Sequence, residues 1–376
     1  MYNSHMRKIN LAIVGLNFGR EFANVYAKDE RINRLVVCDL NEDLLSSYSF
    51  GDRKIEKVNS LDKILDDPEI DAVHLLTPIP LHAKQIIQVL SSGKHCACAV
   101  PMALTIEELD AIIEAKKKSK KRLMLMETSA YTYQMFYIRD QLQLGNVGKI
   151  QFLRGSHYQD MRGWANYWKG FPPMLYGTHA VSPLRLLASQ PIQTVSCHGS
   201  GSMDEELRKQ YNNPYPFETV TMTFKDSDIV AEASRSLFET CRPYQEGLFV
   251  YGSNMSFEWG FHEDDPLNVL IQKDDGVEHK QMYVPNHFRS LPAALKHFTK
   301  SNIGGDFSKE EMEVGQGAPH HGSHPHLVNE FLNLVIKNKQ PYMNLKAAIN
   351  VTAACIYAHQ SAVENGKTIK IPKRFQ

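Results

Sequence analysis

The sequence has no excess of charge of either sign. Its 42 Lys and Arg residues equal its 42 Asp and Glu residues, so the formal net charge is zero. A chain without a basic surplus lacks the electrostatic attraction to phosphate backbones and acidic membranes. Its apolar runs also fall short of the roughly 20 residues that a membrane helix needs. We therefore expect neither nucleic acid nor a membrane as a partner.

Cysteines are few, and they are scattered through the chain. There are six in 376 residues, and a chain of this size does not need disulfides to hold a core. The apolar stretch near the N-terminus is short and runs into a glycine turn, which is typical of a first strand and not of a signal peptide. We therefore expect reduced thiols and a cytoplasmic protein.

The length favours two domains of roughly 100 to 200 residues each. Over residues 1–128, short runs rich in branched aliphatics alternate with amphipathic stretches. Such runs are typical of parallel strands covered on both faces and joined by helical crossovers. We predict an α/β fold that starts with a doubly wound Rossmann domain.

The pattern changes after residue 128. Several strand-like segments follow one another without helices between them, among them "FETVTMTF", "DIVAEASRSLF" and "GLFVYG". This order predicts an open mixed, largely antiparallel sheet in an α+β substrate and oligomerisation domain over 129–376. Its terminal helices either stay with that sheet or pack back on the first domain. The polar, glycine-rich stretch 299–323 is expected to be a long loop, and a lid is one interpretation.

The stretch "NLAIVGLNFGREF" is a strand that runs into a glycine turn. In a dinucleotide fingerprint the first glycine makes the turn, the second lets the backbone approach the diphosphate, and the third permits close helix packing. Here Gly15 holds the first place, Asn17 the second and Arg20 the third, with Gly19 one residue early. Asn tolerates positive φ, so the turn can survive. We predict cofactor contacts from Gly15, Asn17, Phe18 and Gly19; a turn without a ligand is the alternative.

Two carboxylates follow predicted strands of the first domain. Asp39 ends the second strand, where an acidic side chain binds the ribose diol of NAD and repels the 2′-phosphate of NADP. Glu127 ends the last strand of the domain, at the edge where ligands gather, and the alternative is a surface carboxylate. The sequence thus predicts NAD as the cofactor, with Asp39 and Glu127 among the residues that contact it.

Longer blocks of the chain resemble the Gfo/Idh/MocA family of oxidoreductases, which includes glucose-fructose oxidoreductase and inositol dehydrogenase. The resemblance spans nearly the whole chain, and it rests on "VGLNFG", "DAVHLLTPIPLHAKQIIQVLSSGKHCACAVPMALTIEEL", "METSAY" and "YGTHAVSPL". It implies that Thr77, Pro78 and His82 form a loop lining the cofactor, and that Val100 and Pro101 lie beside it.

The chain departs from the family pattern at two positions. Val100 stands where the family has a catalytic lysine, in a Glu-Lys-Pro block, and Leu175 replaces an acidic residue while His179 is kept. The stretch from Tyr176 to His179 also resembles the NAD-dependent glycoside hydrolases of this family. Those enzymes oxidise the sugar, eliminate the aglycone, add water and reduce the product, so that NAD is not consumed.

His179 is the predicted acid/base catalyst. Histidine exchanges protons near neutral pH, as removal of a hydroxyl proton during hydride transfer requires. Tyr176 lies three residues earlier, so both side chains can reach one pocket on a helix. For each residue, plain packing in the core is the alternative.

The segment "GSHYQDMRGWANYWKG" concentrates aromatic and hydrogen-bonding side chains, a combination that suits a carbohydrate. Lys169 in this segment is a hypothetical substitute for the lysine absent at position 100. A polar loop with structural aromatics is the alternative. The predicted substrate-binding residues are His157, Gln159, Asp160, Arg162, Trp164, Trp168, Lys169 and, from a later segment, His324.

"HHGSHPH", residues 320–326, is rich in imidazoles, which are common zinc ligands. A complete ligand set is not evident within the stretch itself, so we predict no bound metal; pocket lining, helix entry and metal binding stay open.

These patterns predict an NAD-dependent oxidoreductase that transfers a hydride between the nicotinamide and a hydroxyl carbon of a sugar, cyclitol or glycoside. A redox-neutral glycoside hydrolase is the first alternative, and a catalytically silent nucleotide- or sugar-binding protein is the second. The family resemblance further implies a homodimer or homotetramer.

Overall fold

A computed structural model of the chain describes residues 7–262, 265–300, 305, 307–315 and 319–376. The chain forms two compact units, and neither is one continuous segment. Unit 1 holds residues up to Tyr131, joined by His287–Glu313 and Ala318–Leu345. Unit 2 holds Thr132–Asn286, Val314–Gly317 and Lys346–Gln376.

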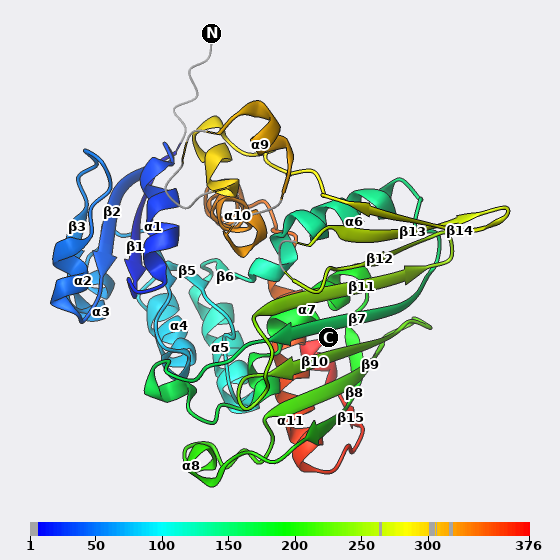
Figure 1. Cartoon of the computed structure of the whole chain (residues 1–376). Coiled ribbons are helices and arrows are strands. Elements are labelled where there is room, and N and C mark those ends of the chain that lie inside the picture. Colours follow the sequence, from blue (N-terminus) through cyan, green and yellow to red (C-terminus); the bar gives the residue numbers. More distant parts are fainter. Residues whose placement is uncertain (1–6, 263–264, 301–304, 306, 316–318) are drawn as a thin grey trace. The chain divides into compact units, whose positions relative to one another are not determined.

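Unit 1 contains a six-stranded sheet in the order β3-β2-β1-β4-β5-β6, with its described pairs parallel. This is the strand order of a dinucleotide-binding fold, so the predicted doubly wound domain is confirmed (Figure 1). The strands are β1 (Ile9–Val14), β2 (Ile32–Cys38), β3 (Glu56–Val58), β4 (Ala72–Leu75), β5 (His95–Cys98) and β6 (Leu123–Leu125).

Helices connect these strands and cover the sheet. They are α1 (Gly19–Lys28), α2 (Glu42–Ser47), α3 (Leu61–Leu65), α4 (His82–Ser91) and α5 (Ile106–Ser119). Helix α5 begins with reciprocal caps: Thr105 accepts from the Glu108 N–H at 3.1 Å, and the Glu108 carboxylate accepts from the Leu104 N–H at 2.8 Å. Such bonds satisfy amides that the helix itself leaves without partners. Late in the sequence, α10 (His324–Lys337) packs against α1.

Unit 2 contains a nine-stranded sheet in the order β14-β13-β12-β11-β7-β10-β9-β8-β15. Strands β7 and β10 pair in parallel and the other described pairs are antiparallel, which confirms the predicted mixed sheet. The strands are β7 (Ile150–Tyr158), β8 (Ile192–Ser200), β9 (Phe217–Phe224), β10 (Val230–Ser236), β11 (Gln245–Gly252), β12 (Met255–Glu258), β13 (Leu267–Lys273), β14 (Gly276–Met282) and β15 (Ile369–Lys370).

The helices of unit 2 include α6 (Tyr133–Gln143), α7 (Thr178–Leu187), α8 (Glu205–Arg208) and the long α11, which begins in unit 1 and runs over Leu345–Val363. Helix α7 packs on β7, β10 and β11. It approaches closely because Gly155 has no side chain: a Cβ there would lie 2.2 Å from the Ala180 carbonyl oxygen. Gly155 thereby sets how near His179, the neighbour of Ala180, comes to the sheet.

The stretch 299–323 is not uniformly irregular as expected. Its described part contains α9 (Lys309–Glu313) and a 3-10 turn, η6 (Pro319–Gly322). The lid interpretation also concerned 301–304, 306 and 316–318, which lie outside the described residues. Across the part of the chain that the structure describes, no helix is both long and apolar enough to cross a membrane.

Candidate functional site

The turn after β1 is closed by two glycines that act differently. Gly15 has φ +96°, and a Cβ on it would lie 2.4 Å from the Leu76 carbonyl oxygen, so only glycine fits. Gly19 would place a Cβ 3.3 Å from the side chains of Ile13 and Leu76. Gly19, rather than Arg20, therefore occupies the position where the helix packs closely on the strand.

Asn17 does not use its tolerance of positive φ. It is not among the described non-glycine residues with φ above zero, so the turn forms without a left-handed residue at this position. Asn17 and Arg20 are exposed, and Phe18 is 38% exposed. The side chain of Phe18, the residue before α1, makes no capping hydrogen bond to this helix. The first turn of α1 thus presents backbone N–H groups and the positive end of its dipole, which suits a diphosphate.

The Asp39 carboxylate lies beside this turn. Its Oδ2 accepts from the Leu16 N–H at 2.7 Å and its Oδ1 from the Asn41 N–H at 2.8 Å. The side chain is only partly buried, so the remaining lone pairs can accept from a ribose diol. The glycine turn, the uncapped helix and this carboxylate together fit a dinucleotide of the NAD type.

The other predicted cofactor residues follow the carboxyl ends of neighbouring strands. Thr77 and Pro78 come after β4, Val100 and Pro101 after β5, and Glu127 after β6. This is the edge at which doubly wound sheets bind ligands.

Among the predicted cofactor residues, the ionisable side chains of His82 and Glu127 are almost completely buried. Both ring nitrogens of His82 lie 2.8 Å from carbonyl oxygens, those of Pro101 and Thr77, so the imidazole ties the two loops together. Burial lowers the pKa of His82 below its usual range. Glu127 is fully buried and accepts from the Ser129 N–H and hydroxyl at 3.2 and 3.0 Å, so it is not a surface carboxylate.

A cavity of about 430 Å³ in unit 1 is lined by Asp29 to Arg31, Ser290 to Leu295 and residues of α10. It lies before Ile32, where β2 starts, and hence at the amino edge of the sheet. Because dinucleotides bind at the opposite edge, this cavity is not the predicted cofactor site.

In unit 2, four ionisable residues form a row across adjacent strands. Glu218 of β9 is in register with Arg235 of β10, Arg235 with His157 of β7, and His157 with Glu246 of β11. Residues in register point to the same face of a sheet. Each of the four is at most 4% exposed. The sheet thus holds a buried row of ionisable side chains on this face.

His179 contacts this row from α7. Its ring lies 4.9 Å from the ring of His157, edge to face, and its Nδ1 lies 3.6 Å from Glu246 Oε1. On its other side, Nε2 lies 3.4 Å from the Tyr176 hydroxyl. The two predicted catalytic residues are therefore brought together, with a carboxylate behind the histidine.

Glu246 and Arg235 are held by several partners. The Tyr244 hydroxyl donates to Glu246 Oε1 at 2.7 Å. Arg235 donates to the carbonyls of Tyr176, His157 and Ser236 and to Gln159 Oε1, at 2.8 to 3.1 Å. Burial lowers the pKa of the Arg235 guanidinium to about 10, so it stays charged at neutral pH. Its Cζ lies 5.1 Å from the centre of the Tyr176 ring.

Glu218 secures the turn that carries Tyr176. It accepts from the Met174 N–H at 2.6 Å, at the start of η4 (Pro173–Tyr176), and its other oxygen lies 2.7 Å from His359 Nδ1. A fully buried carboxylate needs such partners to offset the cost of burial. Glu218 therefore fixes the backbone that presents Tyr176.

The predicted substrate residues after β7 separate into two groups. Gln159 and Trp168 join the cluster: Gln159 through Arg235, and Trp168 through a ring contact of 4.8 Å with Tyr176. The others lie further out. Asp160 and Arg162 pair with each other at 2.5 Å, Trp164 is 57% exposed, and Lys169 is exposed.

His324, the remaining predicted substrate residue, belongs to unit 1, where its Nδ1 lies 3.4 Å from Glu21 Oε2. Burial lowers the pKa of His324 well below its usual range.

Glu218, Arg235 and Glu246 were not found by sequence reasoning. Each of them nevertheless lies on the side of its strand where the other residues are buried and apolar. In β10, for example, Ala231 and Ala233 lie on the same side as Arg235. A charged residue on the buried side of a predicted strand was the available signal, because it needs partners that only tertiary structure provides.

Two family models cover most of the chain. Residues 9–127 match the model described as an oxidoreductase family with an NAD-binding Rossmann fold, and residues 139–371 match the C-terminal alpha/beta domain of the same family. The chain therefore belongs to the Gfo/Idh/MocA oxidoreductase family, as its sequence blocks suggested.

Individual relatives are distant. The "Glycosyl hydrolase family 109 protein 1" of Bacteroides fragilis is 22% identical over 307 residues, which is 74% of this chain and 64% of that protein. The chain thus spans just under two thirds of the length of this relative.

A levoglucosan dehydrogenase solved with NADH superposes with a TM-score of 0.76 at 18% identity, covering 97% of this chain and 100% of the other. Myo-inositol 2-dehydrogenase from Lactobacillus plantarum gives 0.71 at 19% identity, with 97% and 100% covered. These structural likenesses show a shared fold.

Proposed function

We propose that this member of the Gfo/Idh/MocA family is an NAD-dependent enzyme that oxidises a hydroxyl carbon of a sugar, cyclitol or glycoside, with His179 as the acid/base catalyst. The observation that carries the proposal is the position of His179 between the Tyr176 hydroxyl and the Glu246 carboxylate. A titratable imidazole between a hydroxyl and a buried carboxylate is suited to moving a proton.

Bound NAD supplies the hydride acceptor, and unit 1 provides for it with the glycine turn, the uncapped α1 and Asp39. His179 takes the hydroxyl proton as the carbon is oxidised. Glu246, 3.6 Å from Nδ1, stabilises the positive charge that develops on the imidazole. This carboxylate stands in for the acidic residue that Leu175 replaces.

Arg235 takes over part of the role of the absent lysine. Val100 carries no charge, and Lys169 is exposed. Arg235 is fully buried, and its donors are engaged by backbone carbonyls and Gln159, so it acts as a positioning residue. The positive charge of Arg235 lies beside the Tyr176 ring, where it stabilises negative charge that develops on the Tyr176 hydroxyl oxygen. Trp168 is buried against Tyr176 and supports the position of its ring.

Redox-neutral glycoside cleavage is the second candidate. It is favoured by the lysine missing at Val100, by the Tyr176 to His179 stretch and by the name of the Bacteroides fragilis relative. The same His179 would then act twice, as base in the oxidation and as acid in the closing reduction. A catalytically silent protein that binds a nucleotide or a sugar is the third candidate.

One assay separates the three readings. Purified protein is incubated with NAD and a panel of free sugars, cyclitols and nitrophenyl glycosides, and NADH and nitrophenolate are followed together. Net NADH supports the dehydrogenase, and nitrophenolate without net NADH supports the hydrolase. Silence in both channels across the panel, with no nucleotide released on denaturation, contradicts catalysis and supports the binding protein.

We also propose that the protein is a cytoplasmic homodimer or homotetramer. Support comes from partly exposed aromatic side chains on the unit 2 sheet, such as Phe152 and Tyr251, whose rings lie 6.3 Å apart. Such surface is costly to leave in water. Sedimentation velocity at several concentrations tests this, and a monomer throughout would contradict it.

A further inference from the structure

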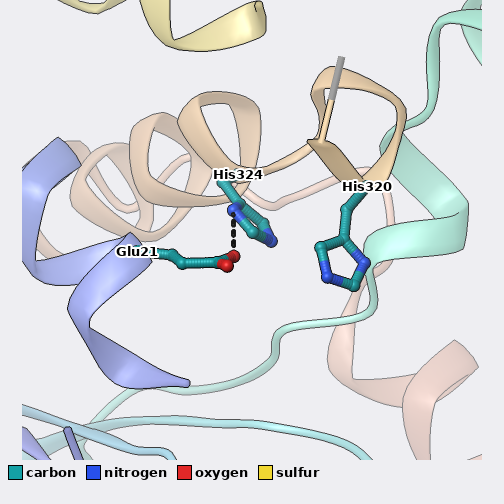
Figure 2. Close-up of side chains that lie close together, drawn as sticks. All are labelled: Glu21, His320 and His324. Carbon is teal, nitrogen blue, oxygen red and sulfur yellow. Dashed lines mark ion pairs between the residues drawn. The ribbon is translucent and has the colours of Figure 1, made fainter. Parts of the chain in front are cut away.

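Three side chains in unit 1 that the proposed reaction does not use lie close together. Glu21 lies in the first turn of α1, His320 in η6, and His324 at the start of α10. One ligand atom from each lies within 4.8 Å of the others. Figure 2 shows the carboxylate and the two imidazoles facing one another from these three elements.

We propose that Glu21, His320 and His324 bind a divalent transition metal ion of the zinc class. Imidazole and carboxylate together suit Zn²⁺ and neighbouring ions, whereas Mg²⁺ and Ca²⁺ prefer oxygen ligands alone. Two imidazoles and one carboxylate make three protein ligands, and three is the number that leaves a zinc ion one open coordination position. The residue types alone therefore select the class of ion.

The spacing of the cluster fits such an ion. Zinc bonds to nitrogen and oxygen are about 2.1 Å long, so two ligands of a tetrahedral ion lie about 3.4 Å apart. The distance from Glu21 Oε2 to His324 Nδ1 is 3.4 Å. The rings of His320 and His324 lie 4.9 Å apart at 35°, so a small rotation of the partly exposed His320 completes the set. A simple ion pair between Glu21 and His324 would not require a second imidazole at this place.

The surroundings are those of a built site. His324 is 1% exposed and its ring lies 4.4 Å from that of Phe22, while the Phe18 ring lies 5.4 Å from His320 and 5.7 Å from His324. Aromatic walls exclude water and strengthen the attraction between a cation and a carboxylate. His320 and His321 both have left-handed backbones, with φ 42° and 50°, a conformation that costs energy in residues other than glycine. The turn that presents His320 is thus strained.

The site adjoins the glycine turn, since Glu21 follows Gly19 by two residues and Phe18 belongs to both. The negative charge of a carboxylate so near a binding place for a diphosphate repels that diphosphate. An ion bound to Glu21 removes that repulsion and offers its open position to water or to an anionic oxygen.

The test is zinc binding to full-length protein without a histidine tag. After treatment with a chelator and dialysis, zinc is added at micromolar concentration, free metal is removed by gel filtration, and bound metal is counted by mass spectrometry. Affinity is measured by competition with a chromogenic chelator. We expect one equivalent of zinc in the wild type. Substitution of one of the three ligands should lower the affinity of the protein for zinc on the order of 100-fold or more. This loss exceeds that usually caused by substituting a residue that only contacts a ligand.

His320→Asn and His321→Asn form a matched pair, because asparagine tolerates the left-handed backbone at both positions. Only His320→Asn should lose the zinc equivalent. His157, His179 and Glu246 make a second group with metal-compatible spacing, so His179→Ala is the control for that group and should keep the equivalent.

Glu21→Gln tests the site by a separate readout. Cobalt bound to the wild type should give visible d–d absorption, and this absorption should be absent in Glu21→Gln. The proposal is overturned if the wild type retains no zinc, if His320→Asn retains it, or if His179→Ala loses it.

Discussion

Two pairs of histidines, one pair in each unit, have different surroundings. In unit 1, burial lowers the pKa of His74 to about 3 and of His95 to about 4, so both imidazoles are neutral at physiological pH. In unit 2, two histidines face carboxylates: His179 lies 3.6 Å from Glu246, and His359 lies 2.7 Å from Glu218. The buried imidazoles of His74 and His95 serve packing, whereas a carboxylate such as Glu246 stabilises the cation that forms when the neighbouring imidazole of His179 takes a proton. This contrast supports the proposal that unit 1 binds the dinucleotide and that unit 2 carries out the proton transfer.

The sharpest test of this contrast removes the unit 2 imidazole. His179→Ala should lower kcat/KM by roughly 10²- to 10⁴-fold, the usual contribution of a general acid/base catalyst. NAD affinity, measured by calorimetry, should stay unchanged because the dinucleotide features lie in unit 1. His279→Ala, at an exposed position of β14, is the matched control. Undiminished turnover in His179→Ala would remove this residue from the mechanism.

Glu246→Gln tests the carboxylate behind the catalyst. We expect kcat to fall roughly 10- to 100-fold, equivalent to about 1.4 to 2.7 kcal/mol of transition-state stabilisation. The acidic limb of the pH profile should move to lower pH, because loss of the negative charge disfavours the protonated imidazole. Glu232→Gln is the control, since Glu232 pairs with Arg154 in a partly exposed position of β10. An unshifted profile would assign Glu246 a structural role only.

Asp39→Asn addresses the unit 1 side of the comparison. Asparagine can still accept from the Leu16 N–H but carries no charge, so the turn should survive. NAD should bind about tenfold more weakly, which corresponds to a loss of roughly 1.4 kcal/mol of binding free energy, and the preference for NAD over NADP should decrease. Asp43→Asn, at an exposed position in α2, should change neither. If Asp39→Asn leaves both affinities as they were, Asp39 does not contact the ribose.

The last prediction concerns the stability of unit 1 at mildly acid pH, and not activity or binding. His74 is fully buried and neutral when folded, with a pKa of about 3, but it titrates near 6.5 when unfolded. As pH falls below 6.5 the unfolded state binds a proton that the folded state does not, so stability present above 6.5 is lost. We expect His74 to contribute about 1.4 kcal/mol of this loss per pH unit. Thermal unfolding of the wild type and His74→Asn between pH 8 and 5 measures it, and parallel curves would contradict it.

Residues whose role depends on local spacing were predictable from the sequence. Gly15 and Asp39 are set by a strand, a turn and the next strand, and the structure places both at the carboxyl edge of the sheet. Which residue packs the helix on β1 was not predictable from the spacing, because the close approach of Gly19 depends on the side chains of Ile13 and Leu76.

The row of Glu218, Arg235, His157 and Glu246 was not predictable in the same way. It depends on the register of four strands, and β7 pairs with β10 in parallel although about 70 residues separate them. Strand alternation gives the buried side of one strand but not its neighbour. The sequence therefore indicated His157 and His179, while their charged partners needed the fold.

The account rests on hydride transfer at a carbon whose hydroxyl proton goes to His179. The most direct measurement is a single turnover of protein saturated with NAD, mixed with a substrate from the panel, in which NADH absorbance and product are followed together in the wild type and in His179→Ala. We predict that NADH appears in the first turnover of the wild type, lasting for a dehydrogenase and transient for a hydrolase, and is lost in the variant. Product that forms without an NADH signal, at equal rates in both proteins, would contradict the account.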